Sequence, residues 1–307
     1  MDARIVIGSR GSRLALWQAN WARDTLLAHR PGLEVEILVV RTRGDRILDV
    51  PFARIEGKGL FTTEIEERLL DGRIDLAVHS LKDLPTEIPE GLALGAVSRR
   101  ADVRDALVSR QGKGLAGLRR GARVGTSSLR RQAQLRHIRP DLMTVDIRGN
   151  VDTRLKKLDE EGLDAVVLAA AGLERLGWGG RISEYLPADQ VLPAPGQGAL
   201  AIEVRAGDAR VGEAVSDLDD EATRCSVTAE RAMLQGLGGG CHVPIGAWGR
   251  IDGAGMVLDG IVAHPGDGRM VRGQVEGATD QAERLGARLA GDLLGRGGAE
   301  ILEAVDG

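Results

Sequence analysis

The sequence predicts an α/β protein built from two lobes of related architecture, followed by a small α+β domain. Short apolar segments typical of strands alternate with segments of helical periodicity through residues 4–204. The segment GRIDLAV at 72–78 returns as GLDAVVL at 162–168, which indicates a second lobe like the first. After residue 244, three strand-like segments are joined by turn-rich connections, which favours an antiparallel sheet.

The first lobe is expected to begin with a strand at 4–7 and a turn at 8–12. A helix follows, and its Leu14, Trp17 and Trp21 recur on one stripe that we expect to face the core.

A second strand is expected at 33–40 and a third at 74–78. Between them, Thr63 and Glu66 have the spacing of a capping box, which predicts the start of a helix.

The second lobe repeats this order with a strand at 123–125 and a helix from residue 129. Polar residues at 98–102 and a proline- and glycine-rich run at 192–198 are candidate hinges. The strand expected at 199–204 would return to the first lobe, so that two crossings join the lobes around a cleft that can open and close.

The C-terminal domain is expected to open with a helix at 221–235 and to close with another at 279–294, on either side of three strands at 245–251, 256–263 and 270–276. The predicted domains are 1–98 with 199–217, then 103–193, and then 219–307.

Composition excludes several classes of protein. The chain of 307 residues has a net charge of −4 and 2% aromatic residues, whereas nucleic-acid binders are basic and use stacking rings. The two cysteines, Cys225 and Cys241, match a reduced cytoplasmic protein and lack the spacing of zinc ligands. No secretory segment or bilayer-spanning apolar run is evident, so we expect a cytoplasmic protein that binds neither membrane nor nucleic acid.

Arginine dominates the basic residues, since only five of the 41 are lysine. A compositional bias explains most of these arginines. Some of them, however, stand where a strand is expected to end, and arginine binds carboxylates and phosphates through paired hydrogen bonds.

Three predicted strand ends carry polar side chains. Asp83 follows a buried strand directly and is preceded by Lys82. Hydroxyl residues at 126–128 stand at a helix start, where free N–H groups attract anions, and arginines follow them one turn later. A third strand end at 147–154 carries two more arginines. The phosphate-binding GxxxxGK[ST] and GxGxxG patterns are missing, so we expect a ligand with several separated carboxylates.

Cys241 stands between three glycines and the sequence His-Val-Pro. Glycine leaves room for a bulky group to approach the backbone, which suits a covalent attachment. A buried, inert thiol in a glycine turn is the alternative from these residues alone.

Five long motifs, taken together and in order, resemble the porphobilinogen deaminase family, also called hydroxymethylbilane synthase. They are VHSLKDLPT (78–86), GTSSLRRQAQL (125–135), IRGNVDTRL (147–155), LPAPGQGALAIEV (192–204) and AERAMLQGLGGGCHVPIGAW (229–248). The resemblance begins at IGSRGSRLALWQA (7–19) and runs into the last domain.

The resemblance implies lobes like those of type-2 periplasmic binding proteins and a monomer. It implies a transferase that joins four porphobilinogen molecules into hydroxymethylbilane with loss of ammonia, possessing a dipyrromethane cofactor bound by thioether to Cys241. Product hand-off to the next enzyme of tetrapyrrole (haem) biosynthesis is a further expectation.

The resemblance also assigns roles by position. Asp83 is the expected catalytic residue, which would stabilise cationic pyrroles and move protons. The expected cofactor-binding residues besides Cys241 are Ser80, Lys82, Thr126, Ser128, Arg130 and Arg131. The expected substrate-binding residues are Arg10, Ser12, Ser127, Arg148, Arg154 and Arg175. No metal site is expected.

Two features depart from the family pattern. His242 stands where the family has glutamine, and we expect it to pack or hydrogen-bond. Cys225 is an additional thiol on a helical stripe with Ala229, Ala232 and Met233, which predicts a core-facing position. The alternative functions are a solute-binding protein and an inactive homologue, which would bind a polycarboxylate without chemistry.

Overall fold

The computed structural model describes residues 4–46, 62–239 and 243–306. The chain divides into two compact units. The first comprises Met1–Ala101 and Ala199–Arg224, and the second comprises Asp102–Gly198 and Cys225–Gly307. The division falls inside helix α8 (Glu221–Gly236). The three-domain boundaries expected from the sequence stay a prediction.

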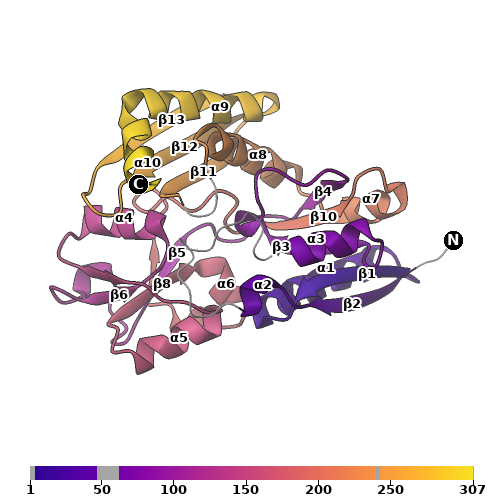
Figure 1. Cartoon of the computed structure of the whole chain (residues 1–307), viewed down its shortest axis with the longest axis horizontal. Coiled ribbons are helices and arrows are strands. Elements are labelled where there is room, and N and C mark those ends of the chain that lie inside the picture. Colours follow the sequence, from indigo (N-terminus) through magenta and orange to yellow (C-terminus); the bar gives the residue numbers. More distant parts are fainter. Residues whose placement is uncertain (1–3, 47–61, 240–242, 307) are drawn as a thin grey trace. The chain divides into compact units, whose positions relative to one another are not determined.

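The first unit contains a five-stranded sheet in the order β2-β1-β3-β10-β4 (Figure 1). Strands β1 and β2, and β1 and β3, are parallel, whereas β10 is antiparallel to both of its neighbours. The return of the chain to the first sheet after the second hinge is therefore confirmed. The strands are β1 (Arg4–Arg10), β2 (Glu34–Val40), β3 (Leu76–Ser80), β4 (Leu92–Val97) and β10 (Leu200–Arg205).

Helices cover both faces of this sheet. Ile5, Ile7 and Ile202 belong to a core cluster on the α1 face, while Ile65 and Ile74 belong to another on the α3 face. The helices of the unit are α1 (Arg13–His29), α2 (Arg43–Arg46), α3 (Thr63–Leu70) and α7 (Ala209–Val215).

Two expectations for these helices are wrong in detail. Trp21 packs against the core as expected. Trp17, however, is 37% exposed, and α1 buries a stripe of small residues that includes Ala15, Ala19 and Ala22. Small side chains let the helix lie close to the sheet. The N-cap of α3 is Thr62 and makes no side-chain cap hydrogen bond, so the capping box does not form. Glu66 is buried because α3 turns it toward the sheet.

The second unit repeats the arrangement in a sheet with the order β7-β6-β8-β5-β9. Strands β6, β7 and β8 are parallel, and β5 is antiparallel to β8 and β9. Both large sheets therefore place one antiparallel strand second from an edge. The strands are β5 (Asp105–Ser109), β6 (Arg123–Gly125), β7 (Met143–Val145), β8 (Ala165–Ala169) and β9 (Glu184–Leu186), and the helices are α4 (Leu129–Ile138), α5 (Val151–Glu160) and α6 (Ala170–Arg175).

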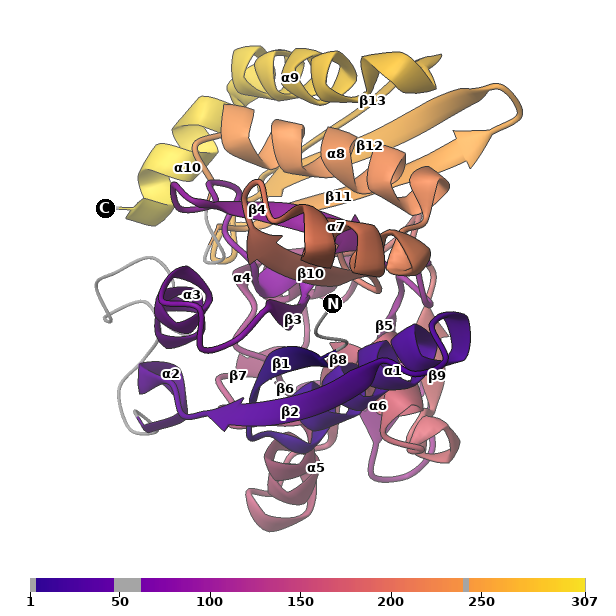
Figure 2. The same cartoon turned by 90° about the vertical axis from the view of Figure 1, so that its right-hand side faces the viewer.

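The C-terminal part of this unit contains the predicted three-stranded antiparallel sheet, in the order β11-β12-β13 (Figure 2). Its strands are β11 (Ile245–Asp252), β12 (Gly255–Ala263) and β13 (Met270–Ala278), and its helices besides α8 are α9 (Ala282–Leu293) and α10 (Ala299–Asp306). The final helix expected at 279–294 is thus shorter, and a kink at Arg296 and Gly297 separates it from α10.

The small sheet packs on two sides within the second unit. Met233 of α8 and Leu289 of α9 belong to the core on one face. Ile261 and Ala263 contact Leu192 and α4 in a separate cluster. The predicted fold class is confirmed: two five-stranded α/β sheets with the same pattern of parallel and antiparallel neighbours, and a small α+β part. No helix in the described ranges has the length and apolarity needed to cross a membrane.

Candidate active site

The loop after β3 carries Lys82 and Asp83 in the first unit. A 3₁₀ turn covers Leu81–Asp83, and Asp83 is exposed between Leu81 and Leu84, which are buried. The Leu81 N–H donates to the carbonyl oxygen of Ala199 at 3.1 Å. The two buried leucines fix the backbone of the turn, and the Asp83 carboxylate projects from this turn to the surface.

The end of β3 is held from both faces of the sheet. On one face, Gln18 Nε2 donates to Ser80 Oγ at 2.8 Å. On the other, His79 Nε2 lies 3.1 Å from Glu203 Oε2, and both side chains are buried. Burial raises the pKa of Glu66, which lies in the same group with Glu203 and His79. The sequence gave no sign of the buried glutamates beside His79, because the strand pairing brings them together.

Arg10 and Ser12 flank the start of α1. The strand β1 runs through Arg10 rather than ending at residue 7. Ser12 is the N-cap of α1, and its Oγ accepts a hydrogen bond from the Ala15 N–H at 3.2 Å. A capping hydroxyl keeps its own O–H available to donate.

The end of β6 presents the expected hydroxyl residues of the second unit. Thr126 is buried, and its Oγ1 accepts from the Ser128 N–H at 3.3 Å. Ser128 is the N-cap of α4 without a side-chain cap bond. The hydroxyl of Ser127 acts differently, because it donates to the Ile147 carbonyl at 2.6 Å and accepts from the Ile147 N–H at 3.0 Å. It thereby fixes the strand end that leads to Arg148.

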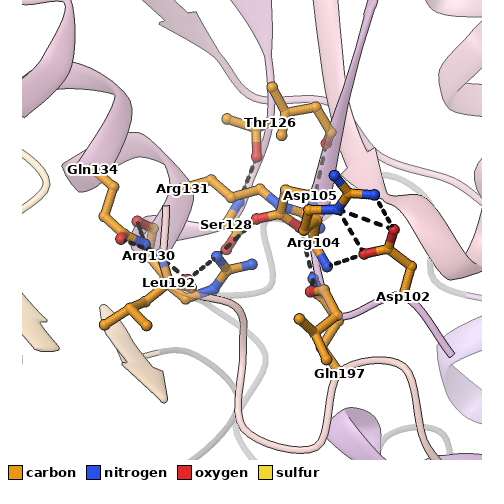
Figure 3. Close-up of polar contacts among 12 residues, drawn as sticks. Asp102, Arg104, Asp105, Thr126, Ser128, Arg130, Arg131, Gln134, Leu192 and Gln197 are labelled. Atoms are coloured by element: carbon orange, nitrogen blue, oxygen red, sulfur yellow. Dashed lines mark hydrogen bonds and ion pairs between the residues drawn. The ribbon is translucent and has the colours of Figure 1, made fainter. Parts of the chain in front are cut away.

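Arg130 and Arg131 form a buried ion cluster with Asp105. Arg130 Nη1 lies 2.8 Å from Asp105 Oδ2, and Arg131 Nη2 lies 2.7 Å from Asp105 Oδ1 (Figure 3). The exposed fractions are 4%, 5% and 0% for Arg130, Arg131 and Asp105. Burial alone would raise the pKa of Asp105, but the charges and hydrogen bonds of the two arginines outweigh it and hold that pKa well below its usual range.

The loop at 192–198 supports this cluster. Arg130 Nη1 also donates to the Leu192 carbonyl at 2.6 Å. Gln197 Nε2 donates to Asp105 Oδ1 at 2.9 Å and to the Val103 carbonyl at 2.7 Å. Gly196 and Gly198 adopt φ values of 74° and 92°, which favour glycine on both sides of the buried glutamine. The sequence predicted only a hinge for this loop and gave no sign of Asp105 and Gln197, since their roles depend on contacts across the unit.

Two of the arginines expected to bind substrate, Arg154 and Arg175, donate to backbone carbonyls of the second unit. Arg154 Nε donates to Gly149 at 2.8 Å, and Arg175 Nη2 donates to Gly198 at 2.7 Å. Burial lowers the pKa of Arg175 to about 10, so it remains protonated at neutral pH. Arg148 is half-buried.

The two cysteines differ in what the structure describes. Cys225 Sγ lies 3.2 Å from the Thr279 carbonyl and 3.9 Å from Met256 Sδ, and the residue packs against the C-terminal core as expected. Cys241 and His242 lie outside the described residues.

Comparison with known proteins gives family matches over most of the chain. Residues 5–213 match the family model described as porphobilinogen deaminase, dipyromethane cofactor binding domain, and residues 224–295 match that of the porphobilinogen deaminase C-terminal domain.

Curated relatives are similar over almost their whole length. A porphobilinogen deaminase of Pelobacter propionicus is 55% identical over 299 residues, 97% of this chain and 96% of the relative. One from Roseiflexus sp. is 53% identical over 302 residues, 98% of this chain and 99% of the relative.

Solved structures give weaker matches. The periplasmic VFT2 domain of BvgS from Bordetella pertussis has a TM-score of 0.41 at 17% identity, covering 71% of this chain and 87% of that domain. The methionine binding protein MetQ has a TM-score of 0.42 at 14% identity, covering 71% and 89%. With two family models and close relatives spanning nearly all of it, the chain belongs to the porphobilinogen deaminase family.

Proposed function

We propose that this chain has the activity of its family, as a hydroxymethylbilane synthase. This transferase joins four porphobilinogen molecules head to tail, with loss of ammonia, into the linear tetrapyrrole hydroxymethylbilane. The match to the family's dipyrromethane cofactor-binding domain over residues 5–213 carries the proposal.

The residues present fit an anionic pyrrole cofactor. Arg131 is only 5% exposed, and its Nε is buried without a hydrogen-bond partner among the described residues. A buried guanidinium donor without a partner is costly, and a carboxylate of a bound ligand would satisfy it. The proposed cofactor-binding residues are Ser80, Lys82, Thr126, Ser128, Arg130 and Arg131, with Cys241 as the covalent anchor of the dipyrromethane. When bound, the group supplies the pyrrole carbon to which the first porphobilinogen is joined.

The other charged residues would bind and steady the substrate. Each porphobilinogen carries an acetate and a propionate, so a growing chain gains two negative charges with every ring. Arg10, Arg148, Arg154 and Arg175 would bind these carboxylates, with Ser12 assisting and Ser127 fixing the strand end beside Arg148. Guanidinium groups at separate positions can each bind a separate carboxylate, whereas a compact phosphate site gathers its donors around one group.

Asp83 is the proposed catalytic residue. The anchored turn gives its carboxylate a fixed position, and an exposed carboxylate can accept hydrogen bonds from pyrrole N–H groups. A fixed negative charge would stabilise positive charge that develops on the pyrroles during bond formation. The same carboxylate would accept and return protons.

The proposed setting is a monomer in the cytoplasm that passes its product to the next enzyme of the pathway. A solute-binding protein without chemistry was the alternative from the sequence. The relatives that span nearly the whole chain are porphobilinogen deaminases and do not support that alternative.

Intact mass measurement tests the proposal first. The purified, denatured chain is expected to weigh more than its sequence by two linked pyrroles, and a Cys241→Ser variant is expected to lack the surplus. An unmodified chain that also gains no mass on incubation with porphobilinogen would contradict the proposal.

Asp83→Asn tests the catalytic assignment. Loss of the charge is expected to reduce turnover at least about 100-fold, in the range known for single catalytic groups. The mass surplus at Cys241 and the melting temperature are expected to stay close to those of the unchanged chain, because Asp83 is exposed. Turnover within a few-fold of the unchanged chain would remove Asp83 from the mechanism.

A further inference from the structure

The net charge of the Asp105 cluster bears on which ligands it can bind. Asp105 is the first residue of β5, and both of its oxygens accept hydrogen bonds from guanidinium groups. Its carboxylate is fully buried, so water does not screen it from either arginine. Asp105 is thus a permanent counter-ion of the arginine pair.

The charge of the cluster follows directly. Arginine stays protonated in proteins, so Arg130 and Arg131 contribute two positive charges. The ionised Asp105 cancels one, and Gln197 completes its hydrogen bonding without adding charge. The nearby Asp102 and Arg104 neutralise each other through a 2.6 Å ion pair (Figure 3). One net positive charge remains to face a ligand.

An anion bound here would meet the unused donors of the cluster. Arg131 Nε is buried without a partner in the described part of the chain. The start of α4, with Thr126 and Ser128 beside it, adds N–H and hydroxyl groups that favour negative charge. A monovalent carboxylate would bring the buried charge to zero. A divalent phosphate or sulfate would leave an uncompensated negative charge in a buried place, which is costly.

We propose that Asp105 is a specificity-determining residue, which sets the net charge of the Arg130–Arg131 cluster to one and thereby selects monovalent carboxylates over divalent oxyanions. The proposal rests on the proposed function, in which this cluster holds a carboxylate of the pyrrole cofactor. Gln197 acts as a positioning residue, because its amide holds the Asp105 oxygen that Arg131 uses.

The test compares anions of different charge on the full-length chain. Unloaded protein, from a host that makes no porphobilinogen, is incubated with porphobilinogen, and its gain of pyrrole mass is timed by mass spectrometry. Sulfate, acetate and methanesulfonate are added at matched ionic strength. Methanesulfonate has three oxygens arranged as in sulfate but only one negative charge. The melting temperature in each of these anions reports anion binding independently of the reaction with porphobilinogen.

Asp105→Asn raises the cluster charge by one. Sulfate is then expected to become at least about tenfold more potent relative to acetate in slowing the mass gain, because one added charge acts at close range. Sulfate is also expected to raise the melting temperature of this variant more than that of the unchanged chain. Methanesulfonate is expected to follow acetate.

Gln197→Lys provides the same change of charge while Asp105 remains, in case the asparagine variant does not fold. Gln197→Met is its uncharged control of similar length. The lysine variant is expected to show the shift toward sulfate, and the methionine variant is not.

A ratio of sulfate to acetate potency that is the same in the unchanged chain and in the folded charge-raising variants would overturn the proposal. Failure of the unchanged chain to gain pyrroles would instead overturn the proposed function. In that case the melting temperatures in sulfate and acetate still decide the charge selection.

Discussion

At the scale of single residues, two buried carboxylates have pKa values shifted in opposite directions. Asp105 is surrounded by guanidinium groups, and its pKa is held below the usual range. Glu66 is buried beside another glutamate, and desolvation raises its pKa. The sign of each shift depends on the nearest charges, so the two residues predict opposite pH effects on stability.

Replacement of Asp105 by asparagine is expected to lower the free energy of unfolding by about 3–5 kcal/mol, because it leaves two buried guanidinium groups without a counter-ion. A lowered pKa in the folded state gives stability that is present above the usual aspartate range and is lost as pH falls. The difference between the two proteins is therefore expected to shrink below about pH 4.

Denaturant unfolding over a series of pH values checks this prediction. Asp102→Asn is the control, since its partly exposed pair with Arg104 is expected to contribute about 1 kcal/mol or less. Equal costs for the two substitutions would show that the Asp105 cluster is not buried as described.

Glu66→Gln is expected to be more stable than the unchanged chain, by an amount that grows as pH increases. A raised pKa in the folded state means that the folded protein favours the protonated carboxyl, so stability is present below the usual glutamate range and is lost as pH rises through the raised pKa. Glutamine keeps the neutral shape and removes that loss. Melting temperatures of Glu66→Gln and the unchanged chain should diverge from about pH 4.5 upward. Glu67→Gln, on the exposed face of the same helix, should show no such divergence.

At the scale of elements, helices α8 and α9 cross closely because one of them carries a glycine at the contact. A Cβ atom at Gly286 would lie 2.2 Å from the Ala229 carbonyl oxygen and 2.8 Å from the Met233 backbone nitrogen. Backbone atoms of a packed helix cannot move away singly, so the two helices would have to separate.

Gly286→Ala is accordingly expected to destabilise the protein by about 1–3 kcal/mol, as overpacking does. Gly291→Ala in the same helix is the matched control, because nothing lies within 4 Å of its added Cβ. Alanine has the higher helix propensity, so this control should stabilise by about 0.5–1 kcal/mol. Thermal unfolding of both variants measures the contrast, and a stabilising Gly286→Ala would refute the close crossing.

At the scale of the whole molecule, the first sheet depends on a strand supplied late in the sequence. β10 lies between β3 and β4 and makes ladders with both. Ile202 at its centre is fully buried. Without β10 the sheet would be split, with exposed edges on both fragments.

Two truncated chains test this dependence. Residues 1–198 lack β10, whereas residues 1–218 retain it together with α7. Hydrogen exchange is expected to show protected amides in β1 and β3 only in the longer chain. Similar protection in both would mean that the first sheet forms without its returning strand.

Much of this protein is predictable from its sequence because some of the information is local. Periodicity and turn residues indicated the fold class, the return of the strand at 199–204 and the antiparallel C-terminal sheet. The motifs indicated the family. Boundaries were less accurate: β1 ends at Arg10 and β3 at Ser80, because pairing with neighbouring strands extends them.

The sequence alone determined which residues are proposed for the site, since its hydroxyl and arginine residues stand in motifs that can be read without the fold. Only the tertiary structure decided how those residues are used. Arg130 and Arg131 share a buried counter-ion that is 25 and 26 residues away in sequence, and Gln197 reaches it from 92 residues away. Such partners contribute through short distances and exclusion of water, and neither quantity exists until the chain has folded.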